Sequence, residues 1–260
     1  MTKFCLASDV HLEFGSLVLD NTENADCLIL AGDIIPFCDL TPKGDLIHNW
    51  VDEFFKNISD QFPVVIWVPG NHEWYGSTMP VGMNQAKKYI EAMGVGNIKL
   101  IDRESIPVGD AIVHGATLWT DYGKGSPINM EQARNSMNDY SQIQVRYKDI
   151  DIMLTPEKLL KEHEESVKFL NDALQPGISN VVVTHHAPLL QAAYDGLWHC
   201  YATDLSDMIL DNPCIKYWAY GHTHTRDTFD VGDTKVVSNC RGYVKYEPMA
   251  KTFSPLYFEC

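Results

Sequence analysis

The stretch that decides the fold is VVIWVPGNHE, residues 64–73. Five apolar residues between two prolines predict a short strand that is buried on both faces. Gly70 allows a tight turn directly after this strand, where Asn71 and His72 are presented together. Open α/β sheets bind their ligands at the carboxyl ends of the strands. The meaning of this polar turn therefore depends on how the other strands end.

Four other apolar segments lead into side chains of the same kind. They cover residues 3–8, 26–31, 180–183 and 215–220, and are followed by Asp9-Val10-His11, Gly32-Asp33, Thr184-His185-His186 and Gly221-His222-Thr223-His224. Helical spacing over residues 46–58 and 81–93 alternates with the first strands, which predicts βαβ units and a parallel sheet. Because the carboxyl ends of parallel strands lie along one edge, we expect these polar side chains to converge.

The second half of the chain mixes short strands with a long polar segment. Strands are predicted at residues 98–101, 106–108 and 111–118, a helix capped by Thr155 and closed by Pro176-Gly177 follows, and residues 228–231 and 235–238 form a hairpin. Residues 120–154 are polar and lack clear periodicity. We interpret them as a cap or insertion over the sheet, the alternative being a surface loop with one helix.

Composition narrows the functional classes. The chain has 260 residues, 45% hydrophobic and 21% charged, which predicts a single globular domain over residues 1–260. Its net charge of −15 disfavours non-specific nucleic-acid binding, although a nucleotide substrate stays possible. Seven cysteines without a CxxC pair indicate reduced thiols and a cytoplasmic protein. No apolar run approaches the ~20 residues of a membrane span, and the amino terminus does not resemble a signal peptide.

The polar strand ends carry metal-ligand chemistry. Residues two apart on a strand face the same side, so Asp9 with His11, and His222 with His224, can converge. Either pair alone is more typical of a surface hydrogen bond. Together with Asp33, Asn71 and His185 they give seven donors of the types that suit Mn, Fe, Zn or Co. Seven donors are too many for one open catalytic ion and fit two ions roughly 3.5–4 Å apart.

These motifs resemble the calcineurin-like metallophosphoesterases, in particular small bacterial or phage-type members. The family order is D-x-H, G-D, G-N-H-D/E, an isolated H, and G-H-x-H, and all five are intact between residues 9 and 224. The resemblance implies a four-layer α/β/β/α sandwich. It also implies two metal ions: Asp9, His11 and His224 would hold one, Asn71, His185 and His222 the other, and Asp33 would bridge them.

The resemblance further implies that His72 donates a proton to the leaving group. The chain departs from the protein phosphatases of the superfamily, whose G-D-x-x-D-R-G motif supplies an Asp that supports this histidine and an Arg that grips phosphate. Here Gly32-Asp33 continues into Ile34-Ile35-Pro36-Phe37. A phosphoprotein substrate is therefore not expected, and the residue that orients His72 is left open.

Substrate-binding residues are less well defined by the sequence. His186 and Tyr75 are candidates because they adjoin the motifs, and Arg241 because Arg can bind phosphate bidentately, the alternative being a surface turn. Aromatic residues near the motifs could stack a base or aryl group, or pack in the core: Trp74, Tyr75, Trp119, Tyr194, Trp198 and Tyr201.

We therefore expect an enzyme that hydrolyses a phosphomonoester or phosphodiester with metal-activated hydroxide. The alternatives are a catalytically weak metal-binding scaffold of the same fold and a nuclease, which the charge disfavours. An amidohydrolase or a metallo-β-lactamase would carry His-x-His early in the chain, whereas here Asp-x-His comes first. The natural substrate, the native metals and the oligomeric state are left open.

Overall fold

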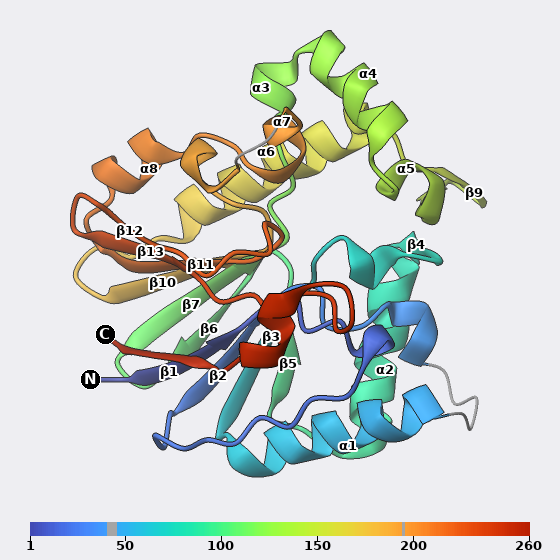
Figure 1. Ribbon diagram of the computed structural model, residues 1–260. Helices are drawn as coiled ribbons and strands as arrows, with labels where there is room; N and C mark the ends of the chain where they lie inside the picture. The colour runs from blue at the N-terminus through green and yellow to red at the C-terminus, as the bar shows by residue number, and fades with distance from the viewer. Residues whose placement is uncertain (41–45, 194–195) are drawn as a thin grey trace.

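The computed structural model describes residues 1–40, 46–193 and 196–260. Its first sheet has the strand order β14-β1-β2-β3-β5, in which β1, β2, β3 and β5 are parallel and β14 is antiparallel to β1 (Figure 1). The strands are β1 (Lys3–Ala7), β2 (Cys27–Ala31), β3 (Val64–Val68), β5 (Ile98–Leu100) and β14 (Leu256–Glu259). The parallel pairing predicted from the βαβ pattern is confirmed, whereas β14 at the end of the chain was not predicted.

The second sheet has the order β12-β13-β11-β10-β7-β6. Its four central strands are parallel, and the two outer strands are antiparallel to their neighbours. The strands are β6 (Glu104–Val108), β7 (Ala111–Ala116), β10 (Ser179–Thr184), β11 (Ile215–Tyr220), β12 (Thr228–Val231) and β13 (Thr234–Ser238). The predicted hairpin is present as β12 and β13.

The two sheets face each other and are covered by helices on their outer faces (Figure 1). Apolar side chains from both sheets, among them Phe4, Ile66 and Val181, form a buried core between them. Helices α1 (Leu46–Gln61) and α2 (Val81–Met93) lie on the first sheet, and α6 (Pro156–Ala173) and α8 (Ser206–Asp211) on the second. This is the four-layer α/β/β/α sandwich that the motifs implied.

Residues 120–154 are more ordered than a surface loop with one helix. They contain α3 (Tyr122–Gly125), α4 (Pro127–Ser136), α5 (Asp139–Gln142), β8 (Ile143–Tyr147) and β9 (Ile150–Met153). Strand β8 pairs with β9 and with the short strand β4 (Ser77–Met79), which follows the third motif. This small sheet was not predicted from the polar sequence, because β9 is exposed along its whole length.

Local signals for helix ends were reliable. The Thr155 side chain caps α6 by accepting the backbone N–H of Lys158, and Gly94 ends α2 in the left-handed conformation. The short helix α7 (Trp198–Tyr201) lies in the loop after β10. Within the described part of the chain, none of the helices has the length and apolar character needed to cross a membrane.

Candidate metal centre

Five strands of the two sheets, β1, β2, β3, β10 and β11, deliver their carboxyl ends to one place. The backbone turns sharply there, because five of the predicted ligands have a positive φ: Asp9 (49°), His11 (49°), Asp33 (57°), His222 (68°) and His224 (49°). Such conformations cost energy in a non-glycine residue and cluster at functional sites. The chain therefore accepts local strain in order to direct these side chains toward one another.

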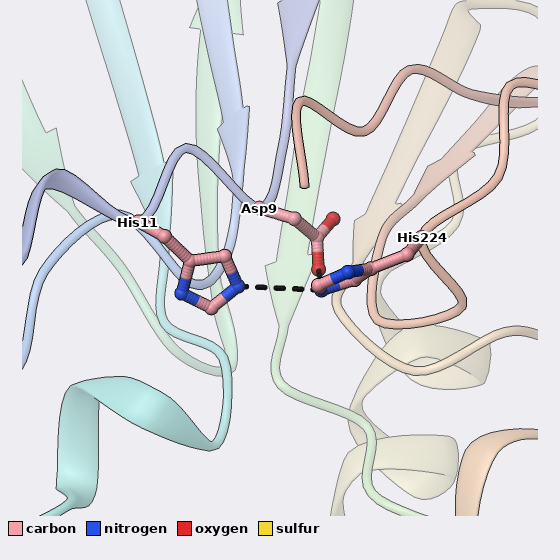
Figure 2. A group of neighbouring side chains, drawn as sticks. All are labelled: Asp9, His11 and His224. Atoms are coloured by element: carbon pink, nitrogen blue, oxygen red, sulfur yellow. Dashed lines mark hydrogen bonds and ion pairs between the residues drawn. The ribbon is translucent and has the colours of Figure 1, made fainter. Parts of the chain in front are cut away.

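Three predicted ligands form a first group (Figure 2). His11 Nε2 lies 3.3 Å from His224 Nε2, and His224 Nε2 lies 3.5 Å from Asp9 Oδ1. All three donor atoms fall within 4.8 Å of one another. The structure thus brings together the three residues expected to hold one ion.

The remaining ligands form a second group next to the first. His185 Nε2 lies 3.1 Å from Asn71 Oδ1, 3.1 Å from His222 Nδ1 and 3.3 Å from Asp33 Oδ1. The other carboxylate oxygen of Asp33, Oδ2, lies 3.7 Å from His11 Nε2 in the first group. Asp33 therefore presents one oxygen to each group, as a bridging ligand would.

Three of the histidine ligands are suited to bind cations, because a hydrogen bond at Nδ1 of each of these rings fixes Nε2 as the nitrogen that faces the centre. His11 and His224 each place Nδ1 against a carboxylate, at 2.9 Å from Glu13 and 2.8 Å from Glu247, so their Nε2 lone pairs face each other. His185 likewise donates Nδ1–H to the carbonyl of Ala31, at 3.0 Å. Lone pairs this close repel one another unless a positive charge lies between them.

The charges at the second group also indicate a site for a cation. Burial alone would lower the pKa of His185, but the carboxylates of Asp33 and Asp9 raise it to about 10. Burial likewise works against the charge of Asp33, yet His185 and His72 hold the pKa of that carboxyl well below its usual range. The carboxylates at this centre are therefore stabilised by positive charge. A proton on His185 supplies that charge, and a metal ion would supply it in place of the proton.

Asn71 is oriented from the segment 120–154. Asp139, at the start of α5, is buried and accepts hydrogen bonds from Asn71 Nδ2 at 2.9 Å and from the Tyr75 hydroxyl at 2.8 Å. The amide is thereby turned so that Oδ1 faces His185. Sequence reasoning missed Asp139 because nothing in its polar surroundings links it to residue 71.

We expect Asp139→Ala to weaken metal binding at the second group by roughly 10- to 100-fold, the usual cost of losing a hydrogen-bond partner behind a ligand. Without Asp139, the Asn71 amide is free to rotate and its oxygen no longer faces the site. Isothermal titration of the metal-free protein with Zn or Mn measures this effect. Asp149→Ala, an exposed carboxylate of the same segment, is the control. Equal affinities in both variants would show that Asn71 needs no such support.

His72 lies beside both groups without joining either. Its Nδ1 is 3.4 Å from Glu13 Oε1, its Nε2 is 3.2 Å from the Tyr243 hydroxyl, and its ring stacks on Tyr75 at 4.2 Å between centroids. Burial disfavours the charged ring, but Asp33 and Glu13 outweigh it and raise the pKa of His72 to about 9. Glu13 is thus the carboxylate in contact with His72, whose partner the sequence left open, and its position two residues after His11 was the only sequence signal for it.

Glu73 connects the turn after β2 with the turn after β3. Its buried carboxylate accepts hydrogen bonds from the backbone N–H groups of Gly70 (2.7 Å), Asp33 (2.9 Å) and Ile34 (2.7 Å), and from Trp67 Nε1 (3.0 Å). Burial and the nearby charge of Asp33 raise the pKa of Glu73 to about 7. The last residue of the GNHE motif is therefore the clamp that fixes the Asp33 turn against the Asn71 turn.

The motif glycines are required by close approach to the ligands. A Cβ at Gly70 would collide with Asp33 Oδ1, and one at Gly32 would collide with the His185 ring. Gly32 also has a φ of +85°, which a side chain would strain. Close approach to the ligands thus explains the glycine before Asp33 and the glycine before Asn71.

Two predicted substrate residues have other roles. Arg241 is only 5% exposed, and its guanidinium donates to the carbonyls of Val10 (2.9 Å), Gly15 (2.9 Å) and Ser16 (2.6 Å). The phosphate-clamp prediction for Arg241 is therefore wrong: a guanidinium that uses its donors on backbone carbonyls holds the loop after β1. The alternative of a surface turn is wrong as well.

His186 is buried behind the second group. Its Nδ1 hydrogen-bonds to the carbonyl of Thr117 at 3.2 Å, and its ring packs 4.2 Å from the ring of His222. It supports His222 and does not line the cavity described below, so the structure gives no support to a contact with substrate. Trp74 and Trp119 are buried as well, and Tyr194 lies outside the described residues.

A cavity of about 480 Å³ opens over the two groups. Its floor includes predicted ligands together with His72, and its walls come from the turn after β3, the segment 120–154, the loop after β10 and the loop after β13. The lining residues are Asp33, Asn71, His72, Tyr75, Ser136, Met137, Asn138, Ala192, Ala193, Tyr201, His222, Thr223, His224 and Tyr243. Tyr75, predicted to face substrate, is among them.

Comparison with known proteins gives one family. A model of the calcineurin-like phosphoesterase family matches residues 2–226. An uncharacterized protein of Acanthamoeba polyphaga mimivirus is 27% identical over 265 residues, which cover 91% of this chain and 89% of the viral protein.

Two solved structures share the fold. A phosphopantetheinyl hydrolase from Mycobacterium tuberculosis aligns with a TM-score of 0.66 at 18% identity, over 95% of this chain and 97% of that chain. A dimetal phosphatase from Danio rerio aligns with a TM-score of 0.55 at 13% identity, over 95% and 89% of the two chains. At these identities the likeness concerns the fold alone.

Proposed function

The chain belongs to the calcineurin-like phosphoesterase family, and on that premise we propose that it hydrolyses a phosphate ester with a binuclear metal centre. The observation that carries the proposal is the position of Asp33. Its two carboxylate oxygens face two separate sets of ligands, at 3.3 Å from His185 Nε2 and 3.7 Å from His11 Nε2. A site for a single ion would need no such shared carboxylate.

Asp9, His11 and His224 would hold one ion, Asn71, His185 and His222 the other, and Asp33 both. Two bound ions of Mn, Fe or Zn would polarise the phosphoryl oxygens and lower the pKa of water toward 7, so that hydroxide is available to attack phosphorus. Carboxylates behind the ligands, Glu13 and Glu247, keep the imidazole rings in the tautomer that offers Nε2 to the centre.

His72 supports the other half of the reaction, the departure of the alcohol. Its ring lines the cavity, Glu13 lies against Nδ1, and Nε2 is directed toward the Tyr243 hydroxyl at the cavity wall. A leaving oxygen that replaces Tyr243 as the partner of Nε2 would receive a proton from it. His72 is thus proposed as general acid.

We take the chain as a single domain in which residues 120–154 form a cap over the active site. Ser136, Met137 and Asn138 line the cavity, and Asp139 holds Asn71. The cap is therefore proposed to shape substrate binding and to support a ligand. A catalytically weak scaffold is disfavoured because a scaffold has no need of a complete donor set with a general acid beside it.

The proposal predicts that protein freed of metal with a chelator does not hydrolyse p-nitrophenyl phosphate esters, and that Mn, Fe or Zn restores the reaction. His185→Ala, which removes the imidazole central to the second group, should lose at least 100-fold in kcat/KM, while circular dichroism confirms folding. Asn171→Ala, on the exposed side of α6, is the control. Hydrolysis that survives both chelation and His185→Ala would exclude the proposed function.

A further inference from the structure

Along the described residues, the walls of the cavity carry no fixed positive charge. Among the described residues that line it, none is a lysine or an arginine. Arg241 lies close in sequence to Tyr243, which lines the cavity. Its guanidinium, however, is buried and donates to three backbone carbonyls. Among the described lining residues, charge on the substrate would be met by His72 and by the metal ions that the ligands would hold.

The same region is rich in carboxylates. Asp9 and Asp33 belong to the donor set, and Glu13, Glu247 and Asp139 lie directly behind His11, His224 and Asn71. Five carboxylates would offset the charge of two divalent ions together with that of a protonated His72, so the site holds no surplus of positive charge for a dianion. A phosphomonoester brings two negative charges into this field and a phosphodiester only one, so the diester meets less repulsion.

The walls also offer apolar surface for a second substituent on phosphorus. Tyr75 lines the cavity from the turn after β3, and Met137 lines it from the segment 120–154. Ala193 and Tyr201 line it from the loop after β10. Tyr75 stacks on His72, and the Tyr201 ring lies 5.1 Å from that of His222, so both tyrosines adjoin the reacting position. A monoester has one organic group that could contact these walls, whereas a diester has two.

We propose that the substrate is a phosphodiester with at least one apolar or aromatic substituent, an inference that rests on the proposed function. Water adds to phosphorus, the bond from phosphorus to one ester oxygen breaks, that oxygen takes one proton, and the other proton of the water is released to solvent. The products are an alcohol and a phosphomonoester, whose second negative charge favours its release from the carboxylate-rich site.

Two substrates with one leaving group test the proposal: methyl p-nitrophenyl phosphate and p-nitrophenyl phosphate, with Mn-loaded protein. We expect kcat/KM to be at least tenfold higher for the diester. Calorimetry gives a second readout, in which diphenyl phosphate should bind more tightly than phenyl phosphate. A preference for the monoester in both measurements would overturn this inference and leave the proposed function standing. Hydrolysis of neither ester would overturn the proposed function itself.

A charge placed on the wall tests the physical reason. Asn138 is exposed and lines the cavity, so Asn138→Arg adds a cation there without disturbing the core. The ratio of diester to monoester kcat/KM should fall roughly three- to tenfold, because one additional attractive charge favours the dianion. Asn171→Arg, on the exposed side of α6, is the matched control and should leave the ratio unchanged. No change in the ratio for Asn138→Arg, or an equal change in both variants, would overturn the argument from wall charge.

Discussion

Asp33→Asn is expected to lower kcat for phosphate-ester hydrolysis by roughly a thousandfold, the upper end of the loss seen when one preorganised electrostatic group is removed. Asp33 is the only described residue placed with one carboxylate oxygen toward each ligand group. Asparagine keeps one oxygen, which can still accept the backbone N–H of His72 at the position of Oδ1. Its NH2 group would then face His11 and could not bind a cation.

The variant should therefore retain one ion tightly and lose the other. Metal analysis after dialysis gives the stoichiometry, and a p-nitrophenyl ester gives kcat. Asp26→Asn is the control, because this exposed carboxylate lies just before the amino end of the same strand, β2. Full activity with two retained ions in Asp33→Asn would mean that the shared carboxylate is not a ligand to both.

The second large effect is expected for His72→Ala. General acid catalysis contributes typically 10²- to 10⁴-fold, and it matters most when the leaving oxygen is strongly basic. We therefore expect a loss of at least 100-fold on an alkyl ester and a much smaller loss on a p-nitrophenyl ester, whose leaving group needs no proton. Metal content should stay at two ions, because His72 belongs to neither ligand group.

The aryl ester serves as the internal control for His72→Ala, since substrate binding and metal loading are common to both reactions. Glu13→Ala should show this selectivity to a smaller degree, on top of a loss common to both esters, because Glu13 lies against Nδ1 of His72 and also against Nδ1 of the ligand His11. An equal loss on both esters would assign His72 to binding and not to proton transfer.

Much of the fold and of the donor set could be predicted because both depend on local signals. Apolar runs such as residues 64–68 read directly as buried strands, and the polar residues that follow each run mark its carboxyl end. Parallel pairing then places those ends together without any knowledge of the loops. The convergence of Asp9, Asp33 and Asn71 follows from this rule within the first sheet, whereas His185 follows β10 of the second sheet and reaches them through the packing of the two sheets.

The remaining residues could not be predicted because their partners are distant in sequence. Asp139 reaches Asn71 across 68 positions, and Glu247 reaches His224 from an irregular segment near the end of the chain. The prediction for Arg241 was wrong for a related reason: nothing in the sequence shows that its guanidinium donates to three carbonyls in the segment after β1. Roles that depend on tertiary hydrogen bonds require the structure.

The most direct test of the binuclear centre is a titration of the metal-free protein with Mn in which bound metal and hydrolysis of methyl p-nitrophenyl phosphate are followed together. The arrangement of Asp33 between two ligand groups predicts two bound ions per chain, with activity that appears only as the second ion binds. Full activity at one equivalent of metal, or in its absence, would contradict the binuclear centre.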